Sequence, residues 1–164
     1  MNRAKYEKIR IFVASPSDVA DERSRLSLVI NRLNKGLADH LGVVLEMKEW
    51  SDVVPNMGRG QQVIFDQIPV STWDVMIGIL WNKYGMPAGG KNPGESGTHE
   101  EFNAAYKSWL ETGRPRIMFY RCVRPIKDSS ILSSSRKGLN MVYLALTKET
   151  REPCSNLRLQ ITES

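Results

Sequence analysis

Polar, acidic and aromatic residues that could bind and react with a small molecule lie in three short segments of the chain. The first contains Ser15 and Ser17, the second contains Trp81 and Tyr84, and the third, 95–101, reads ESGTHEE. Free backbone N–H groups at the start of a helix favour an anion, aromatic rings can stack on a planar ligand, and carboxylates stabilise a developing positive charge. Together the three segments form a candidate ligand site.

Each of these residues also has an ordinary structural interpretation. Thr98 and Glu101 have the spacing of a capping box, in which Thr98 caps the amide of Glu101 and Glu101 reaches back to the amide of Thr98. Ser15 can cap a helix with Pro16 at its first position, and Trp81 can pack beneath the loop that follows it. From the residues alone the capping role of Glu101 is favoured, and no reaction is named.

The pattern of apolar residues predicts the elements that position these segments. Short apolar runs predict strands at 9–15, 43–50, 73–80 and 116–120. Helical spacing predicts one long helix that begins at Ser15 and ends between 36 and 42, and shorter helices at 61–70 and 98–111. This alternation specifies an α/β fold of three layers, with a mostly parallel sheet of four to five strands and flanking helices. In such a sheet the loops beyond the carboxyl ends of the strands hold the ligand, which places the three segments on one rim.

The chain length favours a single folded unit. A chain of 164 residues is long enough for one domain with its own core and short for two. We expect an α/β domain over 1–120, followed over 121–164 by a C-terminal tail or an incomplete final α/β unit. The stretch 81–97 contains five Gly and two Pro, and a connection of that length in a compact domain usually carries function.

The net charge of +5 raises the question of a nucleic-acid partner. The basic excess lies in two places, because residues 1–10 carry four basic side chains against one acidic and residues 121–164 carry eight against four. The residues between them are slightly acidic overall. A nucleic-acid partner is therefore disfavoured, and a basic groove across the domain face is not expected.

The cysteine and histidine content excludes two kinds of site. Cys122 and Cys154 form no C-x-x-C motif, and with only two histidines the sequence supports neither a disulfide framework nor a metal centre. A reducing, cytoplasmic setting is the expectation. No apolar run reaches the roughly 18 residues of a membrane span, and no apolar stretch follows the basic N-terminal residues. We expect no membrane partner.

Read in order, the motifs over about residues 9–120 resemble a TIR-like domain of unknown function found at the N-terminus of STAND (NACHT-type) NTPases. The resemblance rests on a strand followed by a serine turn and an acidic–arginine pair, a central strand that begins with Asp and ends in Tyr-Gly, and a helix start of the form Thr-x-x-Glu-aromatic before a Gly-x-Pro turn. These motifs stand here at Ser15, Asp18, Glu22 and Arg23, at Asp74 and Tyr84-Gly85, and at Thr98, Glu101, Phe102 and Gly113-Arg114-Pro115.

The start of the last predicted helix is also similar to the motif of nucleoside 2-deoxyribosyltransferases, Asp-x-Gly-Thr-x-x-Glu. By this resemblance Glu101 matches the carboxylate that attacks the anomeric carbon, and Asp74 and Glu95 match two acids that contact the sugar or the base. Glu95 stands where the family has Asp, and Asn103 stands where it has Gly. TIR domains that cleave NAD likewise use one glutamate at the start of a helix.

The resemblances imply a TIR-like effector or signalling domain that cleaves the N-glycosidic bond of NAD or a related nucleotide, with NAD as substrate and no resident cofactor. Glu101 would be the catalytic carboxylate. Trp81 or Tyr84 would stack on the base, and Ser15 and Ser17 would hold phosphate, with Thr98 as a further contact. The alternative is a non-catalytic module that self-associates or docks a fused or partner NTPase module, with Glu101 as a helix cap only.

Overall fold

Four parallel strands form the sheet of this protein, seen here in a computed structural model that describes residues 6–83, 85 and 95–122. The strands are β1 (Glu7–Ala14), β2 (Val43–Glu49), β3 (Val75–Leu80) and β4 (Arg116–Arg121), in the order β2-β1-β3-β4. Every neighbouring pair is parallel. Within the described residues, no helix combines the length and apolar character needed to cross a membrane.

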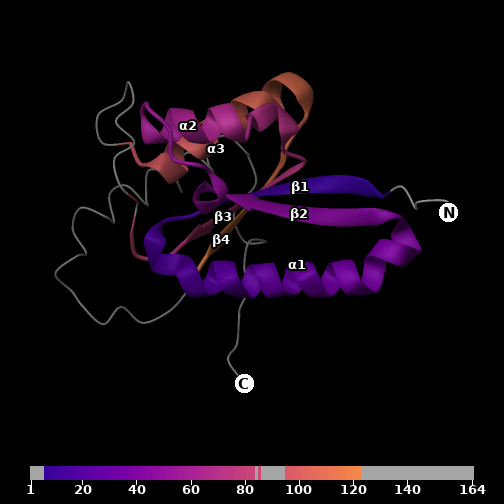
Figure 1. The fold of residues 1–164 in the computed structure, drawn as a ribbon. Coiled ribbons are helices and arrows are strands. Elements are labelled where there is room, and N and C mark those ends of the chain that lie inside the picture. Colours follow the sequence, from indigo (N-terminus) through magenta and orange to yellow (C-terminus); the bar gives the residue numbers. More distant parts are fainter. Residues whose placement is uncertain (1–5, 84, 86–94, 123–164) are drawn as a thin grey trace.

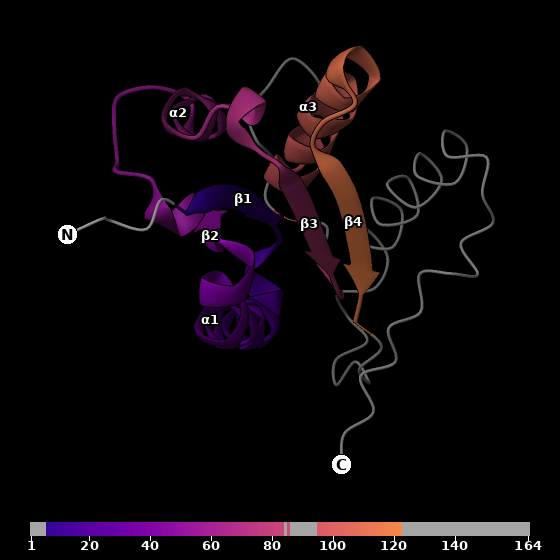
Figure 2. The same ribbon diagram turned by 90° about the vertical axis from the view of Figure 1, so that its right-hand side faces the viewer.

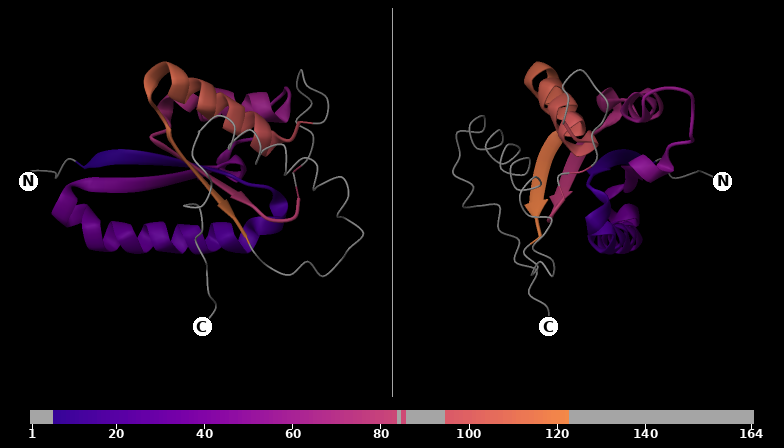
Figure 3. Two further views of the ribbon diagram at one scale, coloured as in Figure 1. Left: turned by 180° about the vertical axis from the view of Figure 1, so that it is seen from behind. Right: turned by 90° about the vertical axis from the view of Figure 1, so that its left-hand side faces the viewer.

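Helices cover both faces of the sheet. The long helix α1 (Ala20–Leu41) lies on one face, and α2 (Gly60–Gln67) and α3 (Gly97–Thr112) lie on the other (Figures 1 and 2). The same three layers are seen from behind and from the opposite side in Figure 3. Three short 3-10 helices, η1 (Ser17–Val19), η2 (Trp50–Asp52) and η3 (Val70–Thr72), complete the connections. The predicted α/β fold with a parallel sheet is confirmed.

Each face of the sheet has its own core because successive side chains of a strand point to opposite sides. On the α3 side the core is aromatic: Phe12 stacks on Trp73 with ring centroids 3.9 Å apart, and Phe102 meets Phe119 edge to face at 5.4 Å. Gly78 is needed here, since a Cβ at this position would overlap the ring of Phe119. The core on the α1 side is aliphatic, built from Ile11, Val13, Val19, Ile30, Ile77 and Ile79.

The start of the first helix differs from the prediction. Ser15 does not cap it: Pro16 precedes the 3-10 turn η1, and the α-helix begins only at Ala20. The hydroxyl of Ser15 instead accepts a hydrogen bond from Arg23 at 2.9 Å. The extended backbone of Pro16, with φ −66° and ψ 170°, delays the helix until the chain has left the end of β1.

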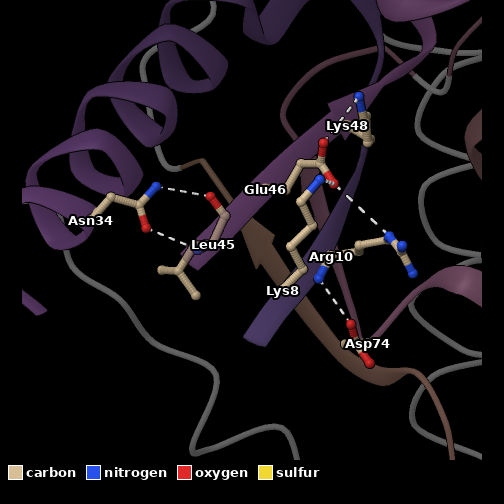
Figure 4. Close-up of polar contacts among 7 residues, drawn as sticks. All are labelled: Lys8, Arg10, Asn34, Leu45, Glu46, Lys48 and Asp74. Carbon is tan, nitrogen blue, oxygen red and sulfur yellow. Dashed lines mark hydrogen bonds and ion pairs between the residues drawn. The ribbon is translucent and has the colours of Figure 1, made fainter. Parts of the chain in front are cut away.

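The first strand begins at Glu7, two residues earlier than predicted, so Lys8 belongs to the sheet together with Arg10. Their side chains and that of Lys48 surround Glu46 at 3.5 to 3.9 Å (Figure 4). These basic residues of the N-terminal segment therefore lie on a mixed-charge surface of β1 and β2.

Side chains from the same chain bind backbone groups at the outer edge of β2. The amide of Asn34 in α1 donates to the carbonyl oxygen of Leu45 and accepts from its N–H, both at 2.8 Å, as a neighbouring strand would (Figure 4). Further along, the carboxylate of Asp52 accepts from the N–H of Glu49 at 2.8 Å. Such contacts protect an edge strand from pairing with another chain.

Candidate functional site

Most of the predicted site residues gather where the strands end. Ser15 and Ser17 follow β1, Trp81 follows β3, and Glu95, Thr98 and Glu101 lie at or before the first turn of α3. Because β1 and β3 are parallel neighbours, the connections that leave their carboxyl ends lie at the same edge of the sheet. A hydrogen-bonded contact joins the two connections, since the carboxylate of Asp18 accepts from the backbone N–H groups of Asn82 and Lys83.

Asp74 is not part of this edge, which corrects the prediction that it joins Glu101. It directly precedes β3 and therefore lies at the amino end of that strand. Its carboxylate accepts from the N–H of Arg10 at 2.9 Å and from the guanidinium of Arg114 at 3.0 Å. Arg114 follows the C-terminal end of α3, whereas Glu101 lies in its first turns. The 16-residue helix and the whole length of β3 separate the two carboxyl groups.

Tyr84, predicted to stack on a base, lies outside the described residues. Its neighbour Gly85 is described, with a φ of 103° that favours glycine. A Cβ on Gly85 would lie 3.1 Å from the Cβ of Ser96, so the loop after β3 passes directly against the start of α3.

The helix α3 is capped by a different residue from the one predicted. The hydroxyl of Ser96 accepts from the N–H of His99 at 3.2 Å, and α3 begins at Gly97. The predicted capping box between Thr98 and Glu101 is therefore wrong, because Thr98 lies inside the first turn and its side chain is buried. The serine two residues earlier takes the cap position, which frees the carboxyl group of Glu101 for another partner.

That partner is Gln61 of α2, whose side-chain amide donates to Oε1 of Glu101 at 2.9 Å. Both side chains are buried, and Glu101 is only 3% exposed. The contact needs close approach of α2 and α3, since a Cβ on Gly97 would lie 2.6 Å from Oε1 of Gln61. Gln61 was not singled out from the sequence, and no local motif marks it, because it lies 40 residues from Glu101.

Burial decides the charge of Glu101. Loss of water raises the pKa of its carboxyl group to about 8, the hydrogen bond from Gln61 acts in the opposite direction, and the nearby charge of Glu100 adds to the rise. At neutral pH the carboxyl group is mostly protonated. Glu100 itself forms a bidentate ion pair with Arg59, in which both N–O distances are 2.6 Å. This ion pair is a second contact, beside that of Gln61 with Glu101, between the start of α2 and α3.

The turn after β1 is held by Arg23 of α1. Its guanidinium donates to the hydroxyl of Ser15 and to the carbonyl oxygen of Pro16, pairs with Glu49 at 2.9 Å, and lies 5.8 Å from the ring centre of Trp50. The hydroxyl of Ser15 is thus engaged and 4% exposed, while Ser17 is exposed. The acidic–arginine motif in the sequence pointed to this arginine without indicating its contacts.

The remaining predicted ligand contacts divide between the two sides of the sheet. Trp81 packs against the aliphatic core on the α1 side, consistent with the structural interpretation of this residue. Glu95 is half-buried just before the Ser96 cap, and Thr98 is buried in the first turn of α3. Thr98 is therefore one of several buried polar side chains at the start of α3, with Ser96, His99 and Glu101.

A buried, protonated carboxyl group can act in two ways. It can donate its proton, or it can ionise when a cation approaches and then stabilise positive charge in a site with little water. Perturbed pKa values of this kind are enriched at functional sites, although structural networks also produce them.

Comparison with known protein families assigns the chain to one of them. Residues 10–156, most of its length, match the family described as Domain of unknown function (DUF4062), a match that continues beyond β4, the last described strand. A search of curated proteins found no match. On the length of the family match, the chain belongs to the DUF4062 family of domains of unknown function.

Proposed function

We propose that this protein is a TIR-like effector or signalling domain that binds a nucleotide at the carboxyl edge of its sheet and cleaves an N-glycosidic bond in it, with NAD as the first candidate. The observation that supports the proposal is Glu101, a carboxyl group 3% exposed in the first turns of α3 at the edge where α/β sheets bind ligands.

The chemistry requires the carboxylate form of Glu101. Cleavage of NAD breaks the bond between the ribosyl C1′ and the nicotinamide nitrogen, whose electron pair leaves with neutral nicotinamide. Water then adds its oxygen to C1′ and releases a proton. Positive charge on C1′ and the ring oxygen is stabilised by a carboxylate beneath the ring. The pKa near 8 keeps the free protein mostly protonated at neutral pH, and the cationic nicotinamide ring of bound NAD favours ionisation.

Access to Glu101 requires an opening between α2 and α3. The carboxyl group is held by Gln61 on α2, and the Arg59–Glu100 ion pair fixes the same two helices. A ribosyl carbon reaches Oε1 only after the Gln61 contact is released. In this proposal Gln61 holds Glu101 in the free protein and releases it when the ligand binds.

The test follows release of nicotinamide from NAD by the purified protein at high concentration, with Glu101→Gln and a control, Glu111→Gln, an exposed position near the end of the same helix. We expect release by the wild type and by Glu111→Gln, none by Glu101→Gln, and a kcat/KM that rises with pH up to about 8 as Glu101 ionises. The proposal is wrong if the wild type is inactive under conditions that drive self-association, or if Glu101→Gln retains the activity.

A second candidate is a non-catalytic self-association module, favoured by apolar side chains exposed on α1. Leu28 is 68% exposed, Val29 52% and Leu33 39%, and Leu28 also lines an open groove of about 520 Å³ beside Met47 of β2. Sedimentation of the wild type and of Leu28→Ser tests self-association, and the nicotinamide assay above separates this candidate from the first. A concentration-dependent dimer that the substitution abolishes supports it, and a wild-type monomer at every concentration contradicts it.

A further inference from the structure

Two consecutive backbone N–H groups converge on a single side-chain oxygen at the carboxyl edge of the sheet. The N–H groups belong to Asn82 and Lys83, directly after β3, and the oxygen is Oδ2 of Asp18, in η1 after β1. The N–O distances are 3.1 Å and 2.7 Å. The contact joins residues 64 and 65 positions apart in the chain, so it is a feature of the fold rather than of a local turn.

The contact lies between β1 and β3, the two strands on either side of which the chain adds its further strands. In the order β2-β1-β3-β4, the chain moves from β1 to β2 on one side and then crosses to β3 on the other. The crevice beyond the carboxyl ends of such a strand pair is where open α/β sheets bind their ligands. Here the carboxylate of Asp18 joins the connections that leave the carboxyl ends of β1 and β3.

Successive backbone N–H groups aimed at one point form a binding site for an anion. The hydrogen bonds are strong when the acceptor is charged, and the exposed ammonium group of Lys83 adds positive charge to the same loop. In the free protein the anion is the protein's own carboxylate. The nearby hydroxyl of Ser15, which the sequence suggested for phosphate, is engaged by Arg23 and buried.

We propose that the N–H groups of Asn82 and Lys83 form a phosphate subsite that Asp18 occupies in the free protein, so that a phosphate-bearing ligand must displace this carboxylate. The proposal deepens the proposed function and rests on it for the identity of the ligand as a nucleotide. The anion site itself is tested with inorganic phosphate and needs no catalysis.

The experiment is a titration with inorganic phosphate at constant ionic strength, followed by the backbone amide NMR signals of Asn82 and Lys83. The variants are Asp18→Ala, Asp18→Asn, and Asp66→Ala as a control that removes the same charge from an exposed position on α2. We expect saturable shifts of both signals in Asp18→Ala, with phosphate binding tighter than in the wild type by about tenfold. Asp66→Ala should behave as the wild type.

Asp18→Asn keeps an oxygen acceptor for the two N–H groups but removes its charge, and it serves if Asp18→Ala does not fold. Because a neutral oxygen is the weaker acceptor, phosphate should bind this variant more tightly than the wild type. The proposal is overturned if a folded Asp18 variant shows no saturable shifts at Asn82 and Lys83, or if Asp66→Ala gains the same affinity. A wild type that releases no nicotinamide, or a Glu101→Gln variant that still releases it, would contradict the proposed function and leave this result unaffected, so the two proposals fail separately.

Discussion

Two carboxyl groups that were expected to share one site lie at opposite ends of the sheet, in contrasting surroundings. Asp74, at the amino end of β3, has a side chain 29% exposed and accepts hydrogen bonds from the N–H of Arg10 and the guanidinium of Arg114. Glu101, in the first turns of α3, is 3% exposed and accepts from the neutral amide of Gln61. The same functional group is therefore a solvated ion-pair partner at one end and a buried acid at the other.

The difference shows that the burial of a carboxyl group, together with the donors around it, sets its chemistry more than its sequence motif does. Asp74 is contacted by a guanidinium and a backbone N–H, and its side chain is partly open to water. A single neutral donor does not offset the loss of water around Glu101, so the proton stays bound up to a pH of about 8. Four predictions sharpen this contrast, from the largest effect to the smallest.

The largest effect is the pH dependence of stability. The pKa of Glu101 is raised from 4.5 to about 8 in the folded protein, so between these values the folded state binds more protons than the unfolded state. This contribution to the free energy of unfolding is fully present below pH 4.5 and is lost as pH rises to about 8, with a slope of up to about 1.4 kcal/mol per pH unit.

Glu101→Gln should remove that slope, and the variant should be the more stable protein at the alkaline end of the range. Asp74→Asn should leave the slope in place. Urea denaturation of the three proteins across the pH range measures this. Parallel profiles for wild type and Glu101→Gln would contradict the assignment of a buried acid.

The second prediction concerns the donor to Glu101. Gln61→Ala removes the hydrogen bond of 2.9 Å and leaves a buried carboxyl group without it, which should lower the free energy of unfolding by about 1–3 kcal/mol. The pKa of Glu101 should rise further, because the Gln61 bond lowers it. Gln62→Ala, an exposed neighbour on α2, is the matched control. Equal losses in the two variants would argue against the Gln61 contact.

The third prediction addresses the exposed carboxylate. Asp74→Asn keeps an oxygen to accept from the N–H of Arg10 but weakens the pair with Arg114. The loss of stability should be about 1 kcal/mol or less and should shrink in high salt. Thermal unfolding at low and high salt measures it, and a larger, salt-independent loss would mean that Asp74 is more than a solvated partner.

The smallest effect is expected for Arg114→Ala. The side chain of Arg114 is 74% exposed, and ion pairs in such positions contribute about 0–1 kcal/mol. A double-mutant cycle with Asp74→Asn gives the coupling energy directly. If the coupling energy between Arg114 and Asp74 were as large as that between Gln61 and Glu101, the two ends of the sheet would not differ in the way described.

The sequence predicted the elements of the fold because their signals are local. The apolar run of β3 and the helical spacing of α1 each lie within one element. The position of Asp74 could also have been predicted, since it is the second residue of the predicted strand 73–80 and therefore lies near its amino end. We instead followed the resemblance to a motif in which this acid contacts the ligand. The Ser96 cap was missed because Thr98, two residues later, satisfies the same pattern.

The partners of Glu101 and Asp18 could not be predicted. Gln61 lies on another helix and meets Glu101 only because α2 and α3 pack on the same face of the sheet. The N–H groups that bind Asp18 belong to backbone, which carries no residue signature. Contacts of this kind depend on strand order and helix packing, which local periodicity does not encode.

The most direct test of the account is an NMR titration of the carboxyl carbon of Glu101, with and without NAD, beside that of Asp74 as the internal reference. A pKa of about 8 in the free protein is expected for Glu101, with a fall when NAD binds, and addition of NAD should leave the chemical shift of the Asp74 carboxyl carbon unchanged. A Glu101 pKa close to its ordinary value of 4.5 that NAD leaves unchanged would contradict both the buried acid and the site proposed around it.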